Sequence, residues 1–230
     1  MVENSGIRER ILAVREKIFS SAARAGRDAA EIKLLGVTKT RTVEEMLEAV
    51  SLVDAIGENR VQEALSKKER WPSDIKIEWH LIGHLQSNKI RRALSFFDAV
   101  DSLDSVALAS AVERTAAETE RVVSVLIEVN TSGEGSKTGV PPGGFSELVD
   151  RIMESPHLEL RGLMTIGPLT DDEAQVRGAF AHLREMAGDA RRRSGLPLPV
   201  LSMGMSSDFE WAIAEGSTMV RIGTSLFGKR

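Results

Sequence analysis

Short apolar segments alternate with longer charged segments along most of the chain. Eight of the apolar segments have the length and composition of strands that are covered on both faces. They lie at residues 32–39, 53–59, 77–83, 97–103, 123–130, 160–167, 199–205 and 219–228. The charged segments between them have helical periodicity and lie at residues 42–50, 60–70, 86–94, 105–120, 143–155, 171–195 and 207–216. An amphipathic helix is expected before the first strand, over residues 5–25.

The alternation of eight strands with seven helices predicts parallel β/α units in an α/β fold. Such units form either a closed (β/α)8 TIM barrel or an open sheet of the flavodoxin or Rossmann type. Eight strands and a length of 230 residues, close to the roughly 250 typical of barrels, favour the barrel. The sequence shows no internal repeat and no interdomain linker. We therefore expect residues 1–230 to form a single barrel domain with an extra N-terminal helix.

Local signals mark three of the predicted helix ends. Thr42 and Glu45 have the spacing of a capping box, in which each side chain bonds the other residue's backbone N–H, and so do Ser207 and Glu210. Gly195 follows the longest charged segment and is a plausible helix stop. These signals predict where the second, seventh and eighth helices begin or end.

Charge and composition exclude several classes of function. The net charge is -4 and no basic patch dominates, so a nucleic-acid partner is not expected. No apolar run reaches the roughly 18 residues that a membrane span needs, and the N-terminus lacks the apolar stretch of a secretory signal. The absence of cysteine excludes thiolate chemistry and is compatible with a reducing compartment. We expect a cytoplasmic protein without a membrane partner.

The first predicted strand, "IKLLGVTK", ends at Lys39. In a β/α barrel the carboxyl ends of the strands form the mouth, where ligands bind. A lysine amine attacks a carbonyl group only when it is neutral, and partial burial against Leu35 and Val37 favours the neutral form. A solvated lysine at a strand end is nevertheless the more common case. The residues alone leave both interpretations open.

Two segments near the other end of the chain have the character of phosphate-binding loops. "MGMSSDF" places the hydroxyls of Ser206 and Ser207 before a helix, and "RIGTSLF" places Gly223 and Thr224 after the last apolar positions. Backbone N–H groups at a helix start favour an anion, and barrels commonly bind phosphate with the loops after strands seven and eight. Ordinary capped turns are the alternative. Arg221 lies inside the last apolar segment, where it needs a partner that is either a structural acceptor or a ligand.

Other motifs do not support a metal or nucleotide site. His80 and His84 are four residues apart, but His80 lies in a predicted strand and no third ligand is evident, so no metal site is expected. The segment "SGEGSKTG" at residues 132–139 does not have the spacing of a P-loop, and no dinucleotide-binding G-x-G-x-x-G follows a strand. This segment belongs to the longest predicted loop, residues 131–144.

Seven segments together resemble one known family. They are "GVTKTRT", "GENRVQE", "WHLIGHLQSNK", "EVNTSGEGSKTG", "LRGLMTIG", "SMGMSSDFEWAI" and "VRIGTSLFG". In this order they resemble the YggS/PROSC group, the pyridoxal phosphate homeostasis proteins. The resemblance extends from about residue 30 to the end of the sequence given.

The resemblance implies a barrel of the alanine-racemase type that binds pyridoxal 5'-phosphate. It implies a covalent Schiff base on Lys39, a ring-nitrogen contact from Arg221 and phosphate contacts from the two loops near residues 206 and 224. Asn59, His80 and Met203 are implied to line the site. The full set of implied cofactor-binding residues is Lys39, Asn59, His80, Met203, Ser206, Arg221, Gly223 and Thr224.

Two functions fit this resemblance. The first is a carrier that holds and delivers pyridoxal 5'-phosphate, with apo forms of pyridoxal phosphate-dependent enzymes as recipients and no catalytic residues of its own. The second is an amino-acid racemase. Alanine racemases add a second domain and use a tyrosine base, whereas this sequence ends at Arg230 and contains no tyrosine. An arginine beside the ring nitrogen also makes the cofactor a weaker electron sink. We therefore expect a monomeric carrier rather than an enzyme, with the closure of loop 131–144 and the role of Lys137 left open.

Overall fold

The computed structural model describes residues 6–134 and 138–229, and these contain eight strands, nine α-helices and four short 3-10 helices. The strands are β1 Lys33–Val37, β2 Ala55–Glu58, β3 Glu78–Leu81, β4 Ala99–Leu103, β5 Val123–Glu128, β6 Leu158–Met164, β7 Val200–Ser202 and β8 Met219–Ile222. The α-helices are α1 Ile7–Arg24, α2 Val43–Ala49, α3 Val61–Lys68, α4 Ile90–Leu94, α5 Val106–Glu118, α6 Phe145–Met153, α7 Glu173–Ser194, α8 Phe209–Ala214 and α9 Thr224–Phe227. The 3-10 helices are η1 Ala29–Glu31, η2 Val50–Leu52, η3 Ser87–Lys89 and η4 Pro142–Gly144.

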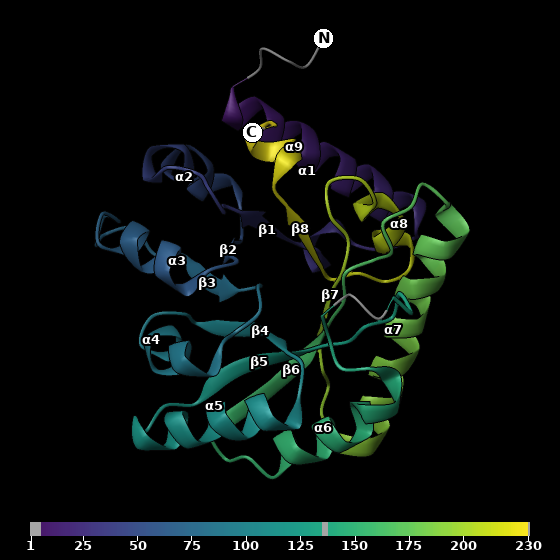
Figure 1. Ribbon diagram of the computed structural model, residues 1–230. Helices are drawn as coiled ribbons and strands as arrows, with labels where there is room; N and C mark the ends of the chain where they lie inside the picture. The colour runs from purple at the N-terminus through teal and green to yellow at the C-terminus, as the bar shows by residue number, and fades with distance from the viewer. Residues whose placement is uncertain (1–5, 135–137, 230) are drawn as a thin grey trace.

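The eight strands form a closed parallel barrel in the order of the sequence (Figure 1). Closure is made by β1 and β8, which pair in parallel with Leu35 opposite Arg221. This pairing confirms the predicted (β/α)8 barrel and rules out the open sheet, whose first and last strands stay apart. All carboxyl ends of the strands therefore meet at one end of the barrel, which we call the mouth.

The local helix signals fare differently. The hydroxyl of Thr42 accepts from the backbone N–H of Glu45, and the carboxylate of Glu45 accepts from the backbone N–H of Thr42. The predicted capping box is therefore confirmed. Gly195 ends α7 in the left-handed region, at φ 70°, as expected of a glycine stop. The capping box at Ser207 is wrong. The residue before α8 is Asp208, whose carboxylate accepts from the backbone N–H of Met205 instead.

The last predicted strand is too long. We expected a strand over 219–228, but β8 ends at Ile222 and the chain turns into helix α9 at Thr224. Leu226 and Phe227 are buried in a cluster with α1 rather than along the sheet. A short apolar run fits a strand or a buried helical turn equally well, so its sequence did not reveal the change.

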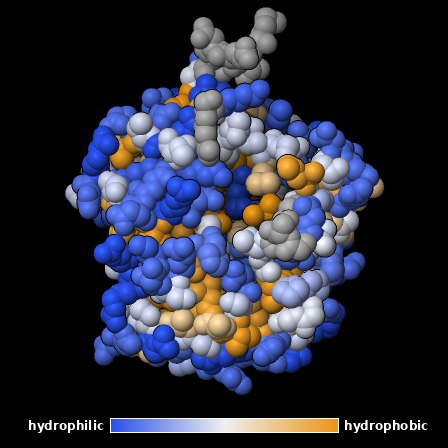
Figure 2. All heavy atoms as spheres, viewed as in Figure 1, coloured by the Kyte–Doolittle hydropathy of each residue, from blue (hydrophilic) through white to orange (hydrophobic). Residues whose placement is uncertain are grey.

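The N-terminal helix α1 is confirmed and packs beside α8 and α9 (Figure 1). Its apolar face is buried, and the side chain of Arg10 donates to the carbonyl of Leu226. Hydrophilic side chains cover most of the surface in the view of Figure 2. Within the described residues, none of the helices has both the length and the apolar character needed to cross a membrane.

Most of the hydrophobic core lies between the sheet and the surrounding helices, and a separate small cluster lies inside the barrel itself. The inner cluster consists of Leu35, Ala55 and Met219. Gly57 makes room for it, because a Cβ at this position would lie 2.2 Å from Cδ2 of Leu35. This apolar plug separates the mouth from the opposite end of the barrel.

Candidate cofactor-binding site

Lys39 lies two residues beyond the end of β1, at the mouth. Leu35 belongs to the inner cluster and Val37 packs against it, so this row of β1 faces into the barrel, and Lys39 follows in the turn directly after the strand. Lys39 is half-buried. Its amine has no hydrogen bond or ion pair with any residue that the structure describes. A cation in this position is free to bind a ligand at the mouth.

The turn after β1 fixes the backbone around Lys39. The N–H of Thr38 donates to the carbonyl of Gly57 at 3.0 Å, and the N–H of Arg41 donates to the carbonyl of Thr38 at 2.9 Å. The side chain of Arg41 reaches the carbonyl of Gly228 at 2.6 Å. The first and last segments of the barrel are therefore joined at the position where Lys39 leaves β1.

The two predicted phosphate loops lie side by side. The backbone N–H of Ser225 donates to Oγ of Ser206 at 3.2 Å. Gly223 lies against β1, since a Cβ built on it would be 3.4 Å from the carbonyl oxygen of Val37. Thr224 follows as the first residue of α9 and is exposed. The structure thus brings Ser206, Gly223 and Thr224 together next to the strand that carries Lys39.

Asn59 follows β2 at the same end of the barrel. Its Oδ1 is buried and has no hydrogen-bond partner among the described residues. A buried polar atom without a partner is unusual in a native structure. At the same end of the barrel as a lysine amine and two hydroxyl-bearing loops, it fits a ligand that supplies hydrogen-bonding groups of its own.

Arg221 points into the barrel and is 4% exposed. It donates to Oγ of Ser202 at 2.8 Å and to the carbonyl of Thr165 at 2.7 Å. Burial lowers the pKa of Arg221, and three nearby carboxylates oppose this shift: Asp101, Glu128 and Asp208. The buried guanidinium of Arg221 is therefore satisfied by two neutral oxygens and by the negative charge of nearby carboxylates.

Glu128 and Asp208 are site residues that the sequence reasoning missed. Burial raises the pKa of both carboxyls, and the charge of Arg221 partly counteracts it. Glu128 also accepts a hydrogen bond from Oγ1 of Thr138, which follows the undescribed residues 135–137. For Glu128 the available signal was an acidic residue at the end of an apolar segment, "LIEVN".

His80 lies at the opposite end of the barrel, and the structure does not bring it together with Lys39. Its Nδ1 is 2.9 Å from Oδ2 of Asp101, and its Nε2 is 3.6 Å from Oε2 of Glu78. Burial lowers the pKa of His80, but the two carboxylates outweigh burial and raise it to about 10. His80 lines a cavity of about 240 Å³ among the amino ends of the strands, together with Lys33, Glu78, Asp98, Glu159 and Arg161.

Met203 is also separate from the mouth. It is fully buried and belongs to the hydrophobic core between the sheet and the helices. Lys137 lies outside the described residues. In the part of the chain that the structure describes, no group of three or more histidine or acidic residues could hold a metal ion; His84 instead pairs with Asp104 at 3.2 Å.

The chain matches the family model described as the alanine racemase N-terminal domain over residues 14–230. It is 44% identical over 223 residues to the pyridoxal phosphate homeostasis protein of Aquifex aeolicus, covering 96% of this chain and 97% of that protein. The protein of the same name from Escherichia coli K12 is 41% identical over 222 residues, with 94% of each chain covered. The chain belongs to the pyridoxal phosphate homeostasis protein family.

Solved structures agree with this membership. A protein of unknown function from Bifidobacterium adolescentis is 40% identical, with a TM-score of 0.90 and coverage of 96% of this chain and 94% of that chain. PipY from Synechococcus elongatus, solved with PLP bound, is 34% identical with a TM-score of 0.85, covering 96% of this chain and all of that one. Alanine racemase from Corynebacterium glutamicum is 20% identical with a TM-score of 0.73, and this chain covers 62% of it, so the likeness is one of fold.

Proposed function

We propose that this protein binds pyridoxal 5'-phosphate as a Schiff base on Lys39 and delivers it to apo-enzymes in the cytoplasm, without turnover of its own. The observation that carries the proposal is the amine of Lys39, which has no partner among the described residues and lies at the same mouth as the Ser206–Ser225 contact. The PLP bound in the related PipY structure supports the choice of ligand.

The residues at the mouth fit this cofactor. Lys39 supplies the amine for its aldehyde, and Ser206, Gly223 and Thr224 supply hydroxyl and backbone N–H groups for its phosphate. Asn59 supplies a polar atom that otherwise has no partner. When bound, pyridoxal 5'-phosphate supplies an electron-withdrawing ring beside an amine. The roles of His80 and Met203 stay predictions, and neither side chain lies with this group.

The racemase alternative lacks a second base of the usual kind. The chain contains no tyrosine, and the cation of Arg221 inside the barrel disfavours a protonated ring nitrogen. The likeness to alanine racemase supports the fold and no activity, because the identity is only 20%. A carrier needs only groups that bind the cofactor, such as Lys39 and the two loops, and it needs no tyrosine base.

The lysine assignment is tested by reduction with borohydride. We expect purified protein incubated with the cofactor to show the visible absorbance of a Schiff base, and reduction to fix the cofactor on the peptide that contains Lys39. Lys39→Ala should abolish both signals. Lys68→Ala is the matched control, because Lys68 is an exposed lysine on α3 and should leave both signals unchanged. Cofactor trapped on another lysine would contradict the assignment.

The absence of turnover is tested separately. We expect L- and D-amino acids incubated with the loaded protein in heavy water to keep their α-hydrogen, as judged by mass spectrometry. Delivery is measured by mixing the loaded protein with an apo-enzyme and following the recovery of its activity, with free cofactor at equal concentration as the control. Rapid α-deuteration of many amino acids would favour the racemase instead.

A further inference from the structure

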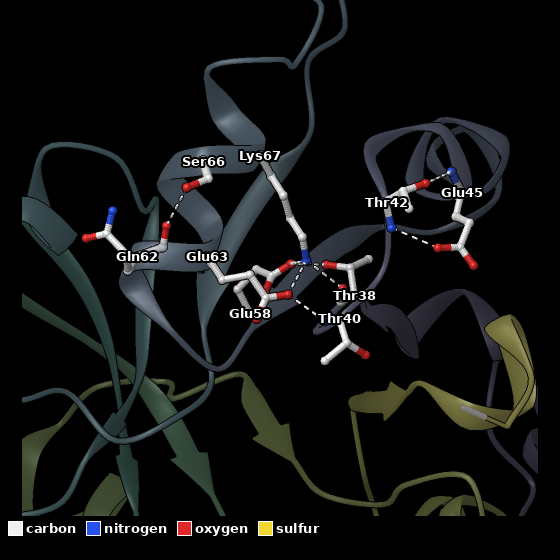
Figure 3. Close-up of polar contacts among 9 residues, drawn as sticks. All are labelled: Thr38, Thr40, Thr42, Glu45, Glu58, Gln62, Glu63, Ser66 and Lys67. Carbon is white, nitrogen blue, oxygen red and sulfur yellow. Dashed lines mark hydrogen bonds and ion pairs between the residues drawn. The ribbon is translucent and has the colours of Figure 1, made fainter.

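A second lysine, Lys67 on α3, is buried beside the turn that carries Lys39 (Figure 3). Its Nζ donates to three oxygens: Oε1 of Glu58 at 2.6 Å, Oε1 of Glu63 at 2.7 Å and the carbonyl of Thr38 at 2.7 Å. An ammonium group has three protons, so every one has an acceptor. Lys67 is 7% exposed and Glu58 is completely buried, which makes this a built ionic cluster rather than a surface pair.

The cluster contacts both neighbours of Lys39. Oγ1 of Thr38 donates to Oε1 of Glu58 at 2.6 Å, and the backbone N–H of Thr40 donates to Oε1 of Glu63. Figure 3 shows the side chains of Glu58, Glu63 and Lys67 converging on this turn from β2 and α3. The residues immediately before and after Lys39 are therefore held by one group of three side chains, those of Lys67, Glu58 and Glu63.

The turn needs such support because Thr40 has a φ of 64°. A β-branched residue in the left-handed region is strained, and such strain persists only where the surroundings hold it in place. The bond to Glu63 fixes the N–H of this residue. Burial raises the pKa of Glu63, but the hydrogen bonds from Lys67 and Thr40 outweigh burial and hold it below its usual value. Glu63 is thus an ionised acceptor in the range where the protein works.

We propose that Lys67, Glu58 and Glu63 form a positioning cluster that fixes the backbone of Lys39 so that its amine stays at the mouth of the barrel. The inference rests on the proposed function, since it assigns the cluster to the attachment of the cofactor. Lys67 does not touch the cofactor in this arrangement. It acts through Thr38 and Thr40, and its charge holds both carboxylates in reach of the turn.

The main experiment compares three loaded variants. Lys67→Met removes the charge while keeping the length of the side chain, and we expect the cofactor to leave at least about tenfold faster, equivalent to about 1.4 kcal/mol. Lys67→Arg keeps the charge and should restore part of the retention. Lys68→Met makes the same change at the exposed neighbour on α3 and should retain the cofactor as the unchanged protein does.

A general loss of stability is excluded by Arg121→Met. Arg121 donates to the carbonyls of Leu94 and Phe97 near the amino end of β4, so this variant loses two partly buried backbone contacts at the opposite end of the barrel. We expect it to lower the melting temperature without changing the rate of cofactor loss. Equal loss of cofactor in Arg121→Met and Lys67→Met would overturn the proposal.

Hydrogen exchange in cofactor-free protein tests the cluster without the ligand. Glu63→Ala keeps the Glu58–Lys67 pair and removes the acceptor for Thr40, so it should fold even if Lys67→Met does not. We expect the amide of Thr40 to exchange at least about tenfold faster in Glu63→Ala, a change of about 1.4 kcal/mol in the opening equilibrium. Unchanged exchange overturns the positioning role and leaves the proposed function standing. If exchange is faster in Glu63→Ala but the unchanged protein never attaches the cofactor, the proposed function is overturned.

Discussion

The two ends of the barrel both carry charged groups, but they satisfy them differently. At the amino end three of the cations have an acidic partner: His80 has Asp101, Lys33 has Glu78, and Arg161 has Glu159. At the mouth, the amine of Lys39 and Oδ1 of Asn59 have no partner among the described residues. Charge alone therefore does not indicate a ligand site. Polar groups without a protein partner do indicate a ligand site, because burying them without a partner is costly.

The most damaging way to probe this contrast is Asp101→Asn. Asp101 is buried, pairs with His80 and is one of the three carboxylates near Arg221, so its loss removes the buried partner of His80 and part of the negative charge around Arg221. We expect the free energy of unfolding, measured with urea, to fall by about 3–5 kcal/mol. The matched change at the same end, Glu159→Gln, breaks the half-exposed pair with Arg161 and should cost at most about 1 kcal/mol. Similar small losses in both variants would contradict the closed, paired character of the amino end.

The next effect is a dependence of stability on pH. The pKa of His80 is raised from 6.5 to about 10, so its contribution is complete below pH 6.5, declines above it and is lost as the pH passes about 10. We expect this group to reduce the free energy of unfolding by up to about 1.4 kcal/mol for each pH unit in that window. Few other groups interfere, because the chain has no cysteine or tyrosine.

The control for this dependence is His80→Asn, which should remove the slope between pH 7 and about 10. NMR of the imidazole nitrogens gives a direct measurement, with both nitrogens of His80 protonated at pH 8. An imidazole that is neutral at pH 8 would contradict the strength of its pairing with Asp101 and Glu78.

The smallest expected effect concerns Asn59. Because its Oδ1 has no partner among the described residues, Asn59→Ala should change the free energy of unfolding by less than about 0.5 kcal/mol. Cofactor affinity should fall by about 1 kcal/mol, several-fold in the dissociation constant, measured by titration. Asn88→Ala, at an exposed asparagine, should change neither quantity. A large loss of stability in Asn59→Ala would mean that the mouth is paired like the amino end.

Much of the fold was readable from the sequence because each strand is a short apolar run covered on both faces. Closure of the barrel followed from the number of such runs. The end of the last strand could not be predicted in this way, since Leu226 and Phe227 fit a strand pattern but form a helical turn that packs against α1. Local apolar composition does not record which neighbour buries a residue.

The sequence predicted site residues that directly follow strands. It did not predict how far along the barrel a side chain lies or which way a helix turns its residues. Lys39, Ser206 and Gly223 follow strands and so reach the mouth. His80 faces inward from β3, but the tilt of the strands puts it at the amino end. The cluster at Lys67 was missed because "RVQEALSKKER" has an ordinary helical pattern, and only the packing of α3 shows which of its two adjacent lysines is buried.

The inner cluster of Leu35, Ala55 and Met219, with the space made by Gly57, closes the barrel between its two ends. A molecule bound at the mouth therefore has a single entrance that serves also as its exit. Loading and unloading cannot proceed simultaneously by different routes. In the proposed delivery, a recipient would wait for the bound molecule to leave or would engage the same opening, so the lifetime of the bound state, rather than passage through the barrel, would set the rate.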